Sequence, residues 1–187
     1  FHYTDGKIPK FGEYTVKTSA SLSGVLHIGR LSDTIRGESV ALALKDAGVK
    51  TRFIWVAENM DPLRKVPKGV PKDFEKYIGM PVTDIPDVKG CHSSYADHHM
   101  EEYFKVVDMF VTTKMEKFSM REEYKKGSFS PFIKKILEKI DDIREIQNRY
   151  RTNPLKKHWS PWTPICDNCG KIVTPHITSF ENGIVTY

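Results

Sequence analysis

Residues 19–30 read SASLSGVLHIGR, in which small hydroxyl residues and a glycine precede a histidine and a second glycine. The residues before it, YTVKT at 14–18, alternate and are rich in β-formers, which predicts a strand. A loose helical pattern follows and stops near Gly48. A short apolar strand is predicted next, over residues 50–57. The order strand, helix, strand favours a βαβ unit and a parallel sheet.

The turn between that strand and helix has the chemistry of an anion site. A helix that starts here exposes unpaired backbone N–H groups, and its dipole favours a negative charge. Gly24 and Gly29 let a ligand approach the backbone, and His27 can donate a hydrogen bond to a phosphate oxygen. The alternative is an ordinary turn with a partly buried histidine. The position of this turn, after the first strand of a doubly wound fold, favours a nucleotide as the ligand.

Composition sets limits on the function. The chain has 187 residues, with 39% hydrophobic and 28% charged, as in globular proteins. No apolar run approaches the roughly 18 residues of a membrane span, and no leader layout is seen after Phe1. A net charge of +5 weakly favours a polyanion such as RNA. Three cysteines form no disulfide framework, so we expect metal binding in a reducing compartment, the cytoplasm.

The middle of the chain changes character. Residues 60–90 carry five prolines, which predicts an irregular excursion with one short helix over 72–78. Helices are predicted over 94–109 and 130–150, the second capped by Ser130. A knuckle and a short hairpin are expected after them.

These patterns divide the chain into three parts. Residues 1–59 form the first βαβ part of a nucleotide-binding domain. Residues 60–160 form a largely helical insertion, and residues 161–187 begin a zinc knuckle.

The first metal candidate has the pattern D-x3-C-H-x5-H, formed by Asp87, Cys91, His92 and His98. Carboxylate, thiolate and imidazole are ligands that zinc prefers, and four of them complete a tetrahedral shell. A structural metal would hold together a proline-broken segment that has little apolar reason to fold. His99 competes with His98 on spacing alone. A buried thiol beside surface histidines is the alternative.

The second metal candidate is Cys166-Asp167-Asn168-Cys169-Gly170, a C-x-x-C-G knuckle. A knuckle supplies two of four ligands, and His176 is the nearest further candidate. A free or redox-active pair is the alternative.

Several segments resemble one family. S-x-S-G-x-x-H-I-G, from residue 21 onward, resembles the first signature of class I aminoacyl-tRNA synthetases. DPLRKVPKGVP at 61–71, YIGMPVTDIPD at 77–87, GCHSSYADHH at 90–99 and EIQNRYR at 145–151 resemble the class I lysyl-tRNA synthetase of archaeal type. That resemblance favours His98 over His99 as the metal ligand, and it places a second cysteine pair after a hairpin that would follow the knuckle.

The resemblance implies a reaction. The lysine carboxylate attacks the α-phosphorus of ATP, bound with magnesium, and the lysyl group then moves to tRNA. It also implies site residues on a Rossmann-like parallel sheet. Those expected to be catalytic are His27 and Gly29; those expected to bind ATP are Ser23, Gly24, His27, Gly29 and Arg30. Those expected to bind the substrate are Ser19, Ser21, Glu58 and Asp61.

The sequence also departs from the family. Where this chain has Ser19, Ser21 and Leu22, the family usually has Gly, Thr and Pro. It usually has Asn in place of Arg30, and two adjacent aspartates in place of Glu58 and Asn59. Its KMSKS signature and anticodon-binding region are absent, so we expect an N-terminal catalytic fragment that is inactive alone. The alternatives are a non-catalytic, zinc-containing RNA-binding paralogue and another nucleotidyltransferase with the HIGH motif. The resemblance also implies that the insertion over residues 60–160, with its zinc site, lies where class I synthetases accept the acceptor end of tRNA. The lysines expected to face tRNA phosphates there are Lys65, Lys68, Lys72, Lys114 and Lys117.

Overall fold

A computed structural model describes residues 11–187 and begins with the expected βαβ unit. Strand β1 (Tyr14–Ser21) leads into helix α1 (Ile28–Asp46), and strand β2 (Thr51–Glu58) follows. The two strands run parallel and pair along their whole length, from Tyr14 opposite Thr51 to Ser21 opposite Glu58. The predicted α/β class and parallel sheet are therefore confirmed.

The sheet has a third strand that the sequence did not mark. Strand β3 (Glu116–Ser119) pairs parallel with β2, giving the order β1-β2-β3. The chain reaches it through helix α2 (Tyr95–Val107). Its four residues, EKFS, alternate too briefly to give a strand signal. The predicted insertion thus contains part of the sheet, and the domain boundaries stay predictions.

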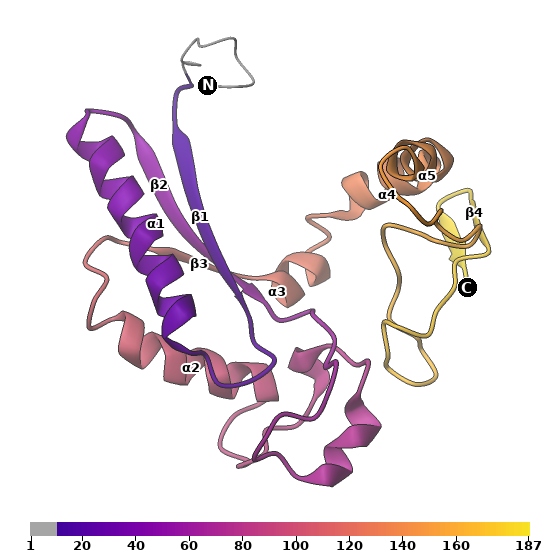
Figure 1. The fold of residues 1–187 in the computed structure, drawn as a ribbon, viewed down its shortest axis with the longest axis horizontal. Coiled ribbons are helices and arrows are strands. Elements are labelled where there is room, and N and C mark those ends of the chain that lie inside the picture. The colour runs from indigo at the N-terminus through magenta and orange to yellow at the C-terminus, as the bar shows by residue number, and fades with distance from the viewer. Residues whose placement is uncertain (1–10) are drawn as a thin grey trace.

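Helices α1 and α2 pack against one face of this sheet (Figure 1). Alternate residues of a strand point to one face, so Phe53 and Trp55 of β2 share a face. Trp55 is fully buried; its ring stacks on Tyr103 of α2 at 5.7 Å and meets the edge of Phe104 at 4.8 Å. These rings form the centre of the core.

Helix α1 approaches the sheet closely at Gly37. A β-carbon at this position would lie 2.4 Å from Thr18 Cγ2 and 3.1 Å from Phe53 Cε2. Glycine is therefore required here because α1 lies directly on β1 and β2.

The same helix is tied to the segment before β3 by a buried carboxylate. Glu38 accepts hydrogen bonds from the backbone N–H groups of Thr112 and Thr113, at 2.6 and 2.7 Å, and from the Thr112 hydroxyl at 3.0 Å. Burial alone would raise the pKa of Glu38, but these hydrogen bonds outweigh it and leave the pKa below its usual value.

Short 3-10 helices replace regular structure between β2 and α2. The predicted helix at 72–78 is present as η2 (Lys72–Tyr77), and η3 (Val82–Asp84) follows it. Leu63 is buried and pairs with the later turn, donating from its N–H to Met80 O at 2.9 Å and accepting from Gly79 N–H at 2.8 Å. The excursion is thus folded back on itself beside the end of β2.

The rest of the chain lies to one side of the sheet (Figure 1). Its elements are α3 (Met120–Lys125), α4 (Ser130–Glu138), α5 (Ile140–Asn148), β4 (Ser179–Glu181) and β5 (Ile184–Thr186), the last two forming an antiparallel hairpin. No helix within residues 11–187 is long and apolar enough to cross a membrane.

The prediction of a single helix over residues 130–150 is wrong. The chain breaks at Lys139, whose φ of −114° and ψ of 21° end α4 and begin α5. Neither proline nor glycine marks this break in the sequence. The predicted cap is also wrong, because Phe129 occupies the N-cap position of α4 and Ser130 is the first helical residue.

We expect Gly37→Ala to lower the free energy of unfolding by about 1–3 kcal/mol, because the added methyl group overpacks the contact with Thr18. Gly12→Ala is the matched control, since nothing lies within 4 Å of its β-carbon position. Urea denaturation measures both, and equal stability of the two variants would contradict the close approach of α1.

We also expect stability to depend on the ionisation of Glu38. The pKa of Glu38 is lower in the folded than in the unfolded protein. Its contribution to the free energy of unfolding is therefore fully present at pH values above about 4.5, the ordinary pKa of glutamate. That contribution is lost as the pH falls through the pKa of the folded state. Glu38→Gln should lower stability at pH 7 by about 1–3 kcal/mol and flatten the acid limb of the pH profile. Glu138→Gln, on an exposed residue, should leave both unchanged; an unaltered acid limb in Glu38→Gln would refute this role.

Candidate active site and metal centre

The loop between β1 and α1 is organised by His27. Its extended backbone caps α1, and its imidazole Nδ1 accepts a hydrogen bond from the backbone N–H of Gly29 at 3.1 Å. Because Nδ1 accepts, the proton of the neutral ring sits on Nε2, which is left as a donor. His27 is exposed, so the alternative of a buried histidine in an ordinary turn does not apply.

Gly29 is needed for this arrangement. A β-carbon there would lie 2.8 Å from His27 Cε1 and 2.9 Å from His27 Nδ1. The H-x-G spacing therefore has a physical cause, since the ring lies over the residue whose N–H it accepts.

Bare amides line the same loop. Within the part of the chain that the structure describes, no backbone N–H from Gly24 to Ile28 donates a hydrogen bond. These groups precede a helix of 19 residues, so the helix dipole adds to their attraction for an anion. The loop can hold a phosphate group.

Helix α2 fixes both ends of this loop. The hydroxyl of Tyr95 donates to the carbonyl oxygen of Ser23 at 3.3 Å, and the hydroxyl of Tyr103 donates to that of Arg30 at 3.0 Å. Tyr103 is also within 2.7 Å of the Thr34 hydroxyl on α1. The loop therefore depends on the position of α2.

A cavity of about 430 Å³ lies where the carboxyl ends of β1 and β2 meet the loop. It brings together five of the predicted site residues. The complete lining is Ser21, Ser23, Arg30, Glu58, Asp61, Pro62, Arg64, Lys65 and Pro67.

The other predicted residues of this site lie outside that cavity. Gly24 and His27 border two neighbouring cavities on the α2 side of the loop. Ser19 lies on β1, where its hydroxyl oxygen is 3.4 Å from Lys17 Nζ. Gly29 lines none of the cavities described.

The two carboxylates in the cavity differ in their partners. Glu58 forms an ion pair with Lys17 at 3.7 Å, whereas the Asp61 side chain has no hydrogen-bond or ion-pair partner within residues 11–187. The backbone of Asp61 is held by its carbonyl, which accepts from Val82 N–H at 3.0 Å. Asp61 is thus a fixed carboxylate free to bind a cation.

Two positions that depart from the family pattern are structural. Leu22 is completely buried in the core. Asn59 is 3% exposed; its amide donates to Ser119 Oγ at 2.9 Å and its carbonyl oxygen accepts from Arg121 N–H at 3.0 Å. Asn59 thus joins the end of β2 to β3 and α3, and neither Leu22 nor Asn59 lines the cavity.

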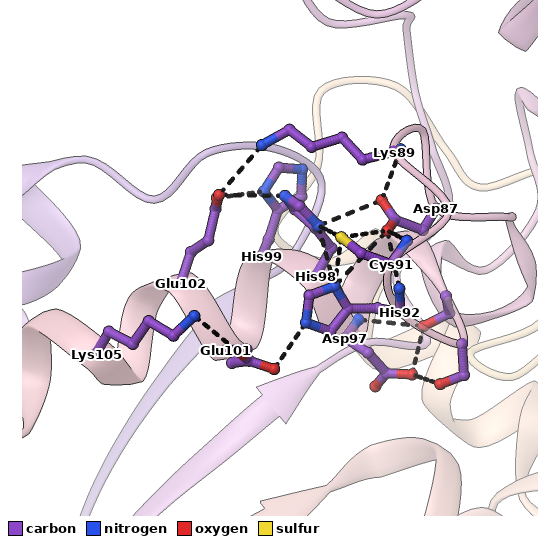
Figure 2. A network of polar contacts seen from close by, with 12 residues as sticks. Asp87, Lys89, Cys91, His92, Asp97, His98, His99, Glu101, Glu102 and Lys105 are labelled. Atoms are coloured by element: carbon purple, nitrogen blue, oxygen red, sulfur yellow. Dashed lines mark hydrogen bonds and ion pairs between the residues drawn. The ribbon is translucent and has the colours of Figure 1, made fainter.

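The metal-ligand pattern converges on one point. Asp87, Cys91 and His92 lie in the loop before α2, and His98 lies at the end of its first turn (Figure 2). Cys91 Sγ lies 3.1 Å from His92 Nδ1 and 3.3 Å from His98 Nδ1, and the two Nδ1 atoms are 3.1 Å apart. The Asp87 carboxylate is 3.2–3.6 Å from the other three atoms.

These distances are close to those around a zinc ion. Ligands about 2.0–2.3 Å from a metal at the centre of a tetrahedron lie about 3.3–3.8 Å from one another. The shortest separations here, 3.1–3.2 Å, are slightly below that range, so a bound ion would move these atoms apart a little. Burial would raise the pKa of Asp87, but hydrogen bonds from the Cys91 thiol and from the N–H groups of Lys89, Cys91 and His92 hold it well below its usual range. Asp87 is therefore ionised and could serve as a metal ligand.

Two glutamates on α2 contact the histidines that could bind the metal. His92 Nε2 lies 2.7 Å from Glu101, and His98 Nε2 lies 3.2 Å from Glu102 (Figure 2). Lys105 and then His92 lower the pKa of Glu101 to about 2. A carboxylate that accepts from Nε2–H leaves Nδ1 without a proton, as metal binding requires.

Neither glutamate was predicted from the sequence. A signal exists for Glu102, which follows His98 by four residues on one helix. Glu101 meets a histidine from the preceding loop, and no local spacing reveals that contact.

His99 has a different environment. Its ring meets the edge of Tyr95 at 4.6 Å; its buried Nδ1 makes no hydrogen bond within residues 11–187 but lies 3.7 Å from a carboxylate oxygen of Glu102. Burial and then the neighbouring His98 lower the pKa of His99. It belongs to a second group of possible ligands with His98 and Glu102, and not to the group around Cys91.

The C-x-x-C turn is present, but it brings together only two side chains that could bind a metal, Cys166 and Cys169. Gly170 N–H donates to Cys166 O at 2.8 Å, which closes the turn, and Cys169 Sγ lies 3.4 Å from the Thr174 hydroxyl. Within residues 11–187, no histidine, further cysteine or acidic side chain lies close enough to Cys166 and Cys169 to serve as a third ligand. His176 is exposed and does not join them.

The lysines expected to face tRNA are dispersed. Lys65 lines the cavity beside the loop and Lys68 lines the neighbouring one. Lys117 lies over the ring of Phe104, 3.5 Å from its centroid. Contact of these lysines with tRNA stays a prediction.

Residues 3–187 match the family described as tRNA synthetases class I (K). The lysine–tRNA ligases of Methanosphaera stadtmanae and Methanocaldococcus jannaschii are 34% and 37% identical over 178 and 179 residues. That of Archaeoglobus fulgidus is 29% identical over 180 residues. These matches cover 95–96% of this chain and 34–36% of the relatives. The chain therefore spans about a third of their length.

We expect one equivalent of zinc at the Asp87 cluster. His92→Ala should remove that equivalent, measured by elemental analysis, and lower the melting temperature as much as chelation lowers that of the native protein. His158→Ala replaces an exposed histidine outside both ligand groups and should change neither quantity. Equal metal content in the two variants would contradict the assignment.

Proposed function

The chain belongs to the class I (K) tRNA synthetases, and on that premise we propose that it carries part of the active site of a lysine–tRNA ligase. The enzyme would join lysine to ATP, forming lysyl-adenylate, and transfer the lysyl group to tRNA. The activity of the whole enzyme would need more than this chain, which spans about a third of its relatives.

One observation carries the proposal. The unpaired backbone N–H groups from Gly24 to Ile28 and the imidazole of His27 lie at the start of a long helix. They are next to a cavity that is lined by both acidic and basic side chains. A triphosphate fits the amides, and an amino acid with a cationic side chain fits the carboxylates.

The reaction needs no nucleophile from the protein. A carboxylate oxygen of lysine attacks the α-phosphorus of ATP, the bond from that phosphorus to the bridging oxygen breaks, and the electron pair leaves on pyrophosphate. His27 Nε2–H and the loop amides donate to oxygens of the phosphate chain as charge builds on them. Gly29 positions the imidazole by donating to its Nδ1. Positioning and charge stabilisation supply the rate enhancement.

Asp61 and Glu58 would hold the ammonium groups of lysine. Asp61 is the stronger candidate because its carboxylate has no partner within residues 11–187, whereas Glu58 must exchange Lys17 for the substrate. Ser21, at the end of β1, lines the same cavity and can hydrogen-bond to the amino acid.

Zinc at Asp87, Cys91, His92 and His98 would be structural. It would cross-link the loop before α2 to the first turn of that helix, and take no part in the chemical step. The tRNA partner is favoured by the family and by the net charge of +5.

ATP–pyrophosphate exchange by the full-length protein tests this function. We expect exchange that depends on lysine, and a loss of about 100-fold or more in kcat for His27→Ala, the size of an oxyanion-type contact. His158→Ala is the matched control and should keep full activity. Exchange with a different amino acid would point to another nucleotidyltransferase, and tRNA binding without any exchange would point to a non-catalytic RNA-binding protein; either would overturn the proposal.

A further inference from the structure

The turn that carries Asp61 is formed by the residues at the end of β2. The N–H of Asp61 donates to the carbonyl oxygen of Glu58 at 3.3 Å, which closes a turn over residues 58–61. Both carboxylates of the cavity therefore lie on this one turn. The position of the Asp61 carboxylate depends on the contacts that hold the turn in place.

Helix η3 holds the turn through its backbone. The N–H of Val82 donates to the carbonyl oxygen of Asp61 at 3.0 Å, and the N–H of Thr83 donates to that of Asn59 at 3.2 Å. These two hydrogen bonds lie on either side of Met60, so a displacement of η3 would also displace Asp61.

Arg121 connects η3 to the start of α3. Its guanidinium makes two contacts with the Asp84 carboxylate, from Nη1 to Oδ2 at 2.9 Å and from Nη2 to Oδ1 at 2.8 Å. Both side chains are mostly buried, with exposed fractions of 26% for Arg121 and 22% for Asp84. A bidentate pair that is shielded from water in this way is stronger and more directional than a single contact on the surface.

The backbone of Arg121 closes a ring of contacts around the turn. Its N–H donates to Oδ1 of Asn59 at 3.0 Å, and Nδ2 of Asn59 donates to Ser119 Oγ at 2.9 Å. Asn59 is 3% exposed, so water does not compete for these hydrogen bonds. Arg121 therefore holds the turn twice, through the side chain of Asn59 and through η3.

Arg121 does not line the cavity that contains the two carboxylates. It borders a separate cavity together with Met60, the residue before Asp61. Any effect of Arg121 on a substrate in the first cavity must therefore pass through the turn.

We infer that Arg121 is a positioning residue for the amino-acid site, because through Asp84 and Asn59 it fixes the turn that presents Asp61. The inference rests on the proposed function, in which Asp61 binds an ammonium group of lysine, and it adds a residue to that function. A carboxylate that is already held in place binds a cation at a lower entropic cost than a mobile one. Loss of Arg121 should therefore weaken the use of lysine and leave the use of ATP unchanged.

Charging of tRNA with lysine by the full-length protein tests the inference, with KM measured separately for lysine and for ATP. We expect Arg121→Ala to raise KM for lysine about 10-fold and to change KM for ATP less than about twofold, as for a misplaced binding group. Arg121→Lys keeps the charge but loses the paired contact, so its KM for lysine should lie between those of Arg121→Ala and the native protein. Arg36→Ala is the matched control, since it removes an exposed arginine that is paired with Asp33, and it should change neither KM.

A double-mutant cycle separates positioning from a general loss of structure. If Arg121 acts through Asp61, Arg121→Ala should lower kcat/KM for lysine no further once Asp61→Asn has removed the carboxylate charge. A merely structural role predicts instead that the two losses multiply. Asp84→Asn should reproduce the effect of Arg121→Ala, and thermal unfolding of each variant verifies that it is folded.

The outcomes separate the inference from the function. If the native protein charges no tRNA with lysine, the proposed function fails and the inference fails with it. If it does charge tRNA, the inference alone is wrong when Arg121→Ala leaves KM for lysine unchanged, raises both KM values alike, or has its full effect in the Asp61→Asn background. If Arg121→Ala does not fold, Arg121→Lys and Asp84→Asn decide by the same criteria.

Discussion

Contact between helix α2 and strand β2 supports every part of the site. Trp55 is fully buried against Tyr103 and Phe104, which fixes the helix on the sheet. The hydroxyl of Tyr103 then holds the start of α1, and that of Tyr95 holds the loop at Ser23. Helix α2 begins at Tyr95, shortly after the cysteine and histidine of the metal cluster. A metal that orders the start of this helix would therefore also order the loop proposed to bind ATP. Each of the two tyrosine hydrogen bonds would contribute about 1 kcal/mol to the stability of that loop.

The cavity at the strand ends combines opposite charges without pairing them to each other. Asp61 and the guanidinium of Arg64 come from one short segment after β2, and neither has an ion-pair partner within the described chain. Asp61 is half-buried, and a half-buried charge usually has a partner because desolvation is costly. In the proposed function, that partner would be an ammonium group of lysine. Arg64 is exposed, so water solvates its charge. A ligand that pairs with Asp61 would therefore stabilise the fold.

Local patterns predicted the parts of the fold that depend on neighbouring residues. The two long strands, α1 and α2 follow from periodicity. Ligand types at close spacing predicted the cluster around Cys91, and the family resemblance was needed to favour His98 over His99. Contacts between distant segments were not predictable. Strand β3 has too few residues for a signal, and the break at Lys139 has no proline or glycine. The burial of Leu22 and Asn59, two positions that depart from the family, depends on β3 and the core, and the place of Arg64 depends on how the segment after β2 folds back.

The central claim is that the loop from Gly24 to Ile28 receives a phosphate chain. Nuclear magnetic resonance of the ¹⁵N-labelled protein, titrated with magnesium and ATP, observes these amides directly. The account predicts saturable downfield shifts of their N–H protons, together with a shift of the His27 Nε2 resonance, while amides at the far end of α1 stay in place. Shifts confined to other surfaces, with the loop amides unmoved at saturation, would contradict it.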